Sequence, residues 1–97
     1  MMPLACIPRA IPNRPRYNEL RQKLRSAITS TQQIENGQSW RLSENHIPLK
    51  ETAEWIEMER LCCPFLAFQF ETMAGSEHRL TLTGPPGTNE FLAAEFA

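Results

Sequence analysis

Residues 49–72 read LKETAEWIEMERLCCPFLAFQFET, and the switch from helix to strand inside this stretch decides the fold. Trp55, Glu59 and Cys62 recur at the spacing of one helical face, which predicts a helix from about position 49 to Cys62. Pro64 ends this helix, because a proline ring pushes the preceding residue towards extended backbone. From Phe65 to position 73 apolar and polar residues alternate, which predicts a strand.

Hairpins are predicted on both sides of this helix. On its C-terminal side, a turn leads from the first strand back to a second one over residues 79–83. On its N-terminal side, Asn36 and Gly37 separate residues 32–35 from residues 38–43. An Asn-Gly pair between two such segments is a strong signal for a hairpin.

Two further helices complete the chain. The first begins at Tyr17 and carries apolar residues at helical spacing up to Ile28. A Gly-Pro-Pro-Gly turn at 84–87 breaks the last strand. It leads to a short closing helix that we expect Thr88 or Asn89 to cap.

The predicted fold class is therefore α+β, with the elements in helix-hairpin-helix-hairpin-helix order and an antiparallel sheet that has helices packed on one face. Prolines at four positions make residues 1–15 an extended lead-in, and residues 16–97 form a single α+β domain. A chain of 97 residues suits one domain, with enough core to fold without metal or disulfide staples.

Composition excludes several classes of function. No apolar run approaches the roughly 20 residues of a membrane-spanning helix, so we expect a soluble protein without membrane contact. The chain contains eleven acidic residues, all of them glutamate, which argues against aspartate-based calcium and magnesium sites. Asn89, Glu90 and Phe91 stand where a phosphate-binding loop needs Gly-Lys-Ser/Thr, so we expect no nucleotide.

Charge is distributed unevenly. Residues 1–30 contain six lysines or arginines against Glu19 alone, and the remainder is acidic. The glutamates of the second helix form a solvated face or a surface on which the arginines of the first helix dock, within the chain or across a homodimer. A net charge of −1 and a pI near 6.1 argue against nucleic acid as a partner. The glutamates concerned are Glu51, Glu54, Glu57 and Glu59.

Three cysteines at wide and uneven spacing do not form the pattern of a secreted disulfide framework. We therefore expect a cytoplasmic protein with reduced thiols. His46 and His78 fall in predicted connections and have no partner pattern nearby, so a solvated loop position is the plain interpretation of each.

The adjacent Cys62 and Cys63 are the residues that most clearly suggest a chemical function. Two neighbouring thiolates can chelate a soft ion such as zinc, copper(I), mercury or arsenite. Cys6 is a candidate third ligand if the lead-in folds back over the second helix, and Glu59 or a histidine can complete the shell. The competing interpretation is that Cys62 and Cys63 pack in the core. Nucleophilic catalysis fits less well, because a helix C-terminus and Glu59 both oppose a thiolate.

Much of the chain resembles a group of small bacterial proteins. Residues 59–68, ERLCCPFLAF, match the group's E-R-x-C-C-P-F-x-x-F box, and residues 80–87, LTLTGPPG, with Phe91 match its L-T-G-P-x-G-x-x-x-F segment. Pro86 departs from the acidic residue that is frequent in the group at that position. The resemblance implies a bacterial protein and assigns it no activity.

Three functional hypotheses follow from these observations. The first is a soft-metal or metalloid binding protein that uses Cys62, Cys63 and Cys6, with zinc or another thiophilic ion as the ligand. The second is a dimeric structural or interaction module whose cysteines are core residues. The third is a small thiol-based enzyme or redox switch, although binding fits the residues better than catalysis does.

Overall fold

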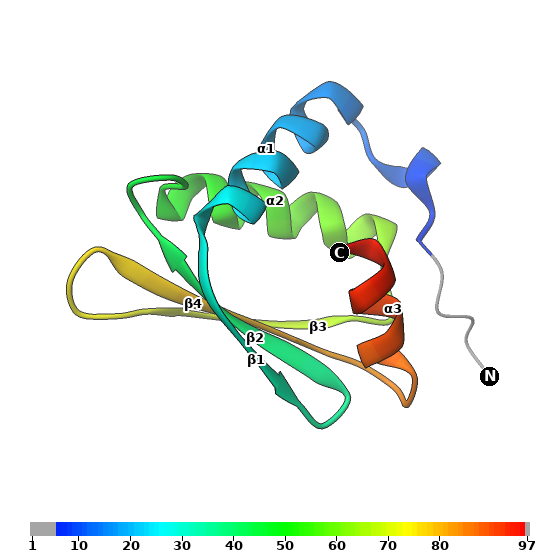
Figure 1. Ribbon diagram of the computed structural model, residues 1–97. Helices are drawn as coiled ribbons and strands as arrows, with labels where there is room; N and C mark the ends of the chain where they lie inside the picture. The colour runs from blue at the N-terminus through cyan, green and yellow to red at the C-terminus, as the bar shows by residue number, and fades with distance from the viewer. Residues whose placement is uncertain (1–5, 97) are drawn as a thin grey trace.

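A computed structural model describes residues 6–96, which form a four-stranded antiparallel sheet and the helices that cover it (Figure 1). In chain order the elements are η1 (Pro8–Ala10), α1 (Arg14–Ala27), β1 (Ile28–Ile34), β2 (Gly37–Ser43), α2 (Leu49–Cys62), β3 (Ala67–Thr72), β4 (Glu77–Thr83) and α3 (Thr88–Glu95), where η1 is a 3₁₀ turn. The α+β class with an antiparallel sheet is therefore confirmed.

The two hairpins join into one sheet through their second strands, in the order β1-β2-β4-β3. Trp40 of β2 lies opposite Leu80 of β4, and both side chains are buried against the helices. On the other face of the same strands, the hydroxyls of Ser39 and Thr81 lie 3.0 Å apart. Figure 1 shows α1 and α2 stacked over one side of the sheet. The apolar side of each central strand thus faces the helices.

The first hairpin turns one residue earlier than the sequence predicts. Glu35 and Asn36 form the turn, and Asn36 adopts a left-handed backbone with φ 54°. Gly37 is instead the first residue of β2, opposite Ile34. A Cβ atom on Gly37 would overlap the backbone carbonyl oxygen of Leu82. The glycine is therefore required by the close approach of β4 and not by the turn.

Residues 1–5 of the predicted lead-in lie outside the described residues, and the rest of it is less extended than expected. Residues 8–10 form the 3₁₀ turn, and α1 begins at Arg14, before Tyr17. The side chain of Asn13 accepts a hydrogen bond of 3.1 Å from the backbone N–H of Arg16 and so caps the helix. Pro15 fits in this first turn because its missing N–H has no helical partner there.

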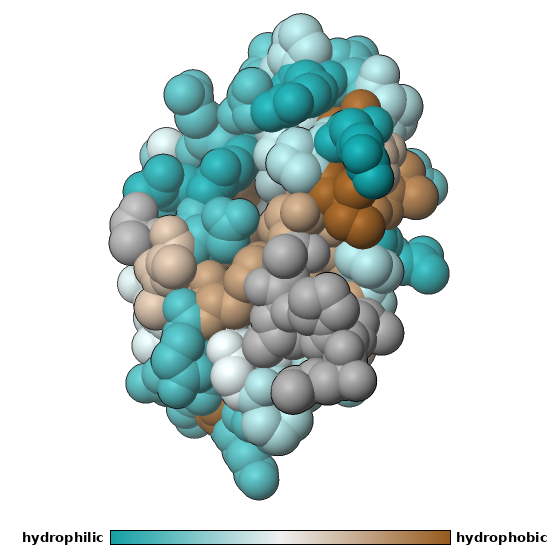
Figure 2. Space-filling model, turned by 90° about the vertical axis from the view of Figure 1, so that its right-hand side faces the viewer, coloured by the Kyte–Doolittle hydropathy of each residue, from teal (hydrophilic) through white to brown (hydrophobic). Residues whose placement is uncertain are grey.

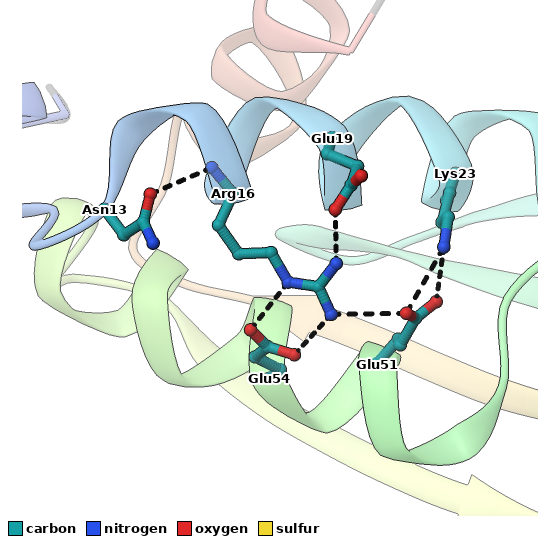
Figure 3. A network of polar contacts seen from close by, with 6 residues as sticks. All are labelled: Asn13, Arg16, Glu19, Lys23, Glu51 and Glu54. Carbon is teal, nitrogen blue, oxygen red and sulfur yellow. Dashed lines mark hydrogen bonds and ion pairs between the residues drawn. The ribbon is translucent and has the colours of Figure 1, made fainter.

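Helix α1 docks on α2 through an ion-pair network (Figure 3). Arg16 donates from Nε and a terminal nitrogen to the two carboxylate oxygens of Glu54, both at 2.8 Å. The same guanidinium contacts Glu51 at 3.2 Å and pairs with Glu19. Lys23 adds bonds of 3.0 and 3.2 Å to Glu51. The predicted docking of a basic first helix on an acidic second helix is thus confirmed for these two glutamates.

Helix α3 begins differently from the sequence prediction. Its N-cap is Gly87 in a left-handed conformation with φ 99°, and no side chain caps it. Thr88 is a buried helical residue whose hydroxyl donates to the carbonyl of Pro85 at 2.6 Å. After the helix, the ring of Phe96 packs edge-on against Trp40, with 5.3 Å between ring centroids. The closing helix therefore covers one end of the core.

His78 is also placed differently from the prediction. It lies inside β4 with no exposed surface, where its Nε2 is 2.9 Å from the hydroxyl of Thr52. The ring packs edge-on against Phe70, and burial lowers the pKa of the imidazole. The expectation of a solvated loop residue is wrong for His78, because the strand begins at Glu77, whereas His46 is exposed.

Within residues 6–96, none of the helices combines the length and the apolar character that crossing a membrane requires.

Candidate metal centre

The site is built at the C-terminal end of α2. The backbone N–H of Cys63 still bonds to the carbonyl of Glu59 at 2.7 Å, but Cys63 has left helical geometry with φ −121° and ψ 76°. Pro64 follows, so the helix ends where the sequence predicts. This ending turns both Cys62 and Cys63 inward, with 3% and 1% of their surface exposed.

The N-terminal segment returns to this helix end. The backbone N–H of Ile7 donates to the carbonyl of Cys62 at 2.8 Å, which satisfies one of the free carbonyls of the last turn. Ile11, at the other end of residues 7–11, is buried in the core and so holds this segment against the fold. Figure 1 shows the η1 turn, in blue, beside the end of α2 that is nearest to α3. These contacts bring Cys6 to the vicinal pair, as the fold-back hypothesis requires.

Figure 2 views this side of the molecule. Apolar surface, in brown and tan, lies on it beneath a border of hydrophilic side chains. Ile7 and Leu61, from the two segments that meet at the site, are among the exposed large apolar residues. The cysteines themselves lie deeper, and only Cys6 is half-buried.

Cys6 and Cys63 are joined by a disulfide across 57 positions of the chain, and Cys62 is the remaining free thiol. The expectation of reduced thiols without a disulfide therefore needs correction. Wide spacing along the chain concealed the pairing, because the fold-back of residues 6–11 places the two Cα atoms 4.8 Å apart. That separation lies inside the range that disulfides span.

Of the two places that the sequence suggests for Glu59, the solvated acidic face is wrong, whereas a position beside the cysteines agrees with the structure. Glu59 is 1% exposed and does not belong to the solvated acidic face, on which Glu57 is exposed. The signal was present in the sequence, since Glu59 shares its helical face with Trp55 and Cys62, and both of these are buried. A carboxyl on such a face must enter the core.

The two oxygens of Glu59 face different partners. Oε2 accepts a hydrogen bond of 2.6 Å from the hydroxyl of Tyr17, and Oε1 lies 3.0 Å from Sγ of Cys63 and 4.0 Å from Sγ of Cys6. Burial raises the pKa of this carboxyl, against the opposing effects of the Tyr17 bond and the charge of Arg21. When Cys63 is reduced, its thiol can donate to Oε1 of Glu59, whereas the disulfide form has no hydrogen to donate.

The tyrosine completes the local network. Burial raises the pKa of Tyr17, and the neighbouring Glu59 raises it further. The hydroxyl therefore stays protonated and donates to the carboxyl at all ordinary pH values. The apolar spacing of the first helix predicts only that Tyr17 faces the core, and it gives no sign of the hydrogen bond made by the hydroxyl.

Together these contacts create a compact group of side chains that could hold a metal ion. One sulfur from each of Cys6, Cys62 and Cys63 and a carboxylate oxygen of Glu59 all lie within 4.8 Å of one another. All three predicted ligands are thus brought together, and Glu59 joins them as a fourth. Neither histidine belongs to this group among residues 6–96.

The surroundings disfavour a free thiolate. Burial raises the pKa of Cys62, and the nearby Glu59 adds to the effect. A thiol that stays neutral and is 3% exposed is a poor nucleophile. The same thiol can still lose its proton to a bound cation, because the cation replaces it as the positive charge. Chemically, the arrangement therefore supports chelation better than covalent catalysis.

No family model matches this chain, and no curated protein or solved structure is similar to it. The resemblance based on the ERLCCPFLAF box therefore stays a prediction.

Proposed function

We propose that the reduced protein binds a soft metal or metalloid ion through Cys6, Cys62 and Cys63, with Glu59 as a fourth ligand. The observation that supports this proposal is the convergence of all four ligand atoms within 4.8 Å. A tetrahedral zinc ion with bonds of about 2.3 Å needs sulfur atoms about 3.8 Å apart. Side-chain movements of about an ångström therefore suffice to close the shell.

The chemistry of the ligands supports a soft ion. Three sulfurs and one carboxylate suit zinc or more thiophilic ions and not calcium or magnesium, which prefer shells of oxygen. Cys62, Cys63 and Glu59 are buried at a helix end that carries partial negative charge. A divalent cation would balance the thiolates there. Tyr17, which bonds to the second oxygen of Glu59, would orient the carboxylate ligand.

The test is a native mass spectrum of the reduced protein with zinc and, separately, with mercury(II). We expect one ion per chain, lost in the Cys62→Ser, Cys63→Ser double variant. Leu61→Ser is the matched control, because this neighbouring side chain is 52% exposed and lies outside the cluster. The same spectrum reports whether the protein is the predicted homodimer. A reduced protein that retains neither ion would refute metal binding.

The second candidate is a structural role for the cysteines, and the Cys6–Cys63 disulfide favours it. In that case the bond ties the lead-in to α2 and Cys62 fills space in the core. The native mass spectrum separates the two candidates, because a purely structural set of cysteines holds no ion when it is reduced.

A further inference from the structure

We propose that Cys6 and Cys63 form a redox-controlled release device for the bound ion: a small-molecule disulfide oxidises them to the cystine and thereby expels the metal. The inference rests on the proposed function and names its regulation. It is carried by the use of the same two sulfur atoms in the disulfide and in the ligand group.

The two states exclude each other chemically. A metal ligand must be a thiolate, and a sulfur in a disulfide has no thiolate charge to donate. Formation of the Cys6–Cys63 bond removes two of the three sulfur ligands and leaves Cys62 with Glu59. Two remaining ligands, one thiol and one carboxyl, do not make the closed shell of a tightly bound zinc ion.

The backbone is already suited to both states. The Cα atoms of Cys6 and Cys63 are 4.8 Å apart, inside the usual range for a disulfide. The hydrogen bond from Ile7 to the carbonyl of Cys62 holds this approach through main-chain atoms, so it does not depend on the state of the sulfurs. Switching therefore requires side-chain rotation and no rearrangement of the fold.

Access to the cluster selects Cys6 as the first residue to react. Cys62, Cys63 and Glu59 are each at most 3% exposed, whereas Cys6 is half-buried in a segment whose η1 turn has no buried residue. An oxidant from solution therefore meets the Cys6 sulfur before the others. The buried Cys63 is then the nearby partner that resolves the first product.

The reaction balances with glutathione disulfide as the oxidant. The Cys6 thiolate attacks one sulfur of glutathione disulfide, breaks its S–S bond, and releases one glutathione thiolate. The Cys63 thiolate then attacks the Cys6 sulfur of the mixed disulfide, forms Cys6–Cys63, and releases the second glutathione. Two electrons pass from the protein to the oxidant. The metal leaves as a hydrated ion, and Cys62 takes up a proton.

The experiment starts from the reduced, zinc-loaded full chain, treated with glutathione disulfide. Released zinc is measured with a metallochromic dye, free thiols are counted, and the disulfide is located by mass spectrometry of peptides. We expect release of the zinc, a fall from three free thiols to one, and a Cys6–Cys63 link. The zinc affinity of the oxidised protein should fall by more than the roughly 10–100-fold that loss of a supporting group costs. Dithiothreitol should restore binding.

Two variants keep the test decisive. Cys62→Ser retains the reacting pair, so it should still form the Cys6–Cys63 link. Cys6→Ser removes the accessible thiol, so its remaining thiols should react with glutathione disulfide at least tenfold more slowly. Retention of zinc by the oxidised chain, or release of zinc without this disulfide, overturns the inference and leaves metal binding intact. If the reduced chain never binds zinc or mercury(II), the proposed function fails and the release device fails with it.

Discussion

Breaking the Cys6–Cys63 disulfide should destabilise the metal-free protein by about 4 kcal/mol. The bond closes a loop with a sequence separation of 57 residues. In the chain-entropy relation, cross-linking over this length removes about 14 cal/mol/K from the unfolded ensemble, which is about 4 kcal/mol at room temperature. For a domain of this size, that loss lowers Tm by roughly 15–30 °C.

The assay is thermal unfolding followed by circular dichroism, with and without a phosphine reductant, in the presence of a chelator. Urea unfolding under the same conditions gives the free energy directly. Cys6→Ser is the matched variant: it removes the bond at its half-buried end and leaves the buried Cys63 in place. We expect this variant to have the Tm of the reduced natural chain, and we expect the reductant to leave that Tm unchanged.

The oxidised and reduced chains must first be verified by mass. If their unfolding free energies then differ by less than about 1 kcal/mol, the reduced ensemble retains the fold-back and the entropic argument is wrong. Zinc provides a further check, because an ion present at about 100 times its Kd should return about 2.7 kcal/mol to the reduced chain.

Three other predictions concern the fold. Gly37→Ala should destabilise the protein by about 2 kcal/mol or more in urea unfolding, because the added methyl group meets the backbone carbonyl of Leu82; native-like stability would contradict the close approach. Stability should fall as the pH drops below about 6.5, by up to about 1.4 kcal/mol per pH unit, because the pKa of His78 is lowered in the fold and the unfolded chain binds the proton first. His78→Gln should flatten this part of the pH profile and His46→Gln should not, and an unchanged profile in the first variant would assign the effect elsewhere. Arg16→Ala should lower Tm at low ionic strength, with a smaller loss at 1 M salt, because the pairs it removes are partly exposed and screened; a loss independent of salt would indicate packing instead.

The sequence predicts most of the local structure because local signals are strong here. Pro64 fixes the end of α2, and the alternation after it fixes the edge strand β3. Boundaries were less accurate where two signals compete. The Asn36-Gly37 pair correctly predicts a hairpin, but Gly37 is needed where β2 packs closely against β4. The turn is therefore formed by Glu35 and Asn36, one residue earlier than predicted.

Long-range pairing was predictable only in part. The contact between α1 and α2 could be predicted from composition, because one helix is basic, the other is acidic, and opposite charges attract. Nothing in the spacing of Cys6 and Cys63 predicts a bond across 57 residues, since it depends on the path of residues 7–11 over the end of α2. That path is fixed by one main-chain hydrogen bond and one buried isoleucine, neither of which has a sequence signature.

Glu59 connects the fold to the chemistry of the site. A carboxyl with 1% exposure is costly unless it is paired. Its hydrogen-bonding partners in this structure are a tyrosine hydroxyl and a sulfur, and the nearby charge of Arg21 favours its ionised form. A leucine at this position would fill the same space without that cost. An acidic group beside three cysteines is therefore difficult to explain by packing alone. It is readily explained if a bound cation pairs with the carboxylate, and replacing Glu59 by leucine should then stabilise the metal-free fold while weakening zinc binding.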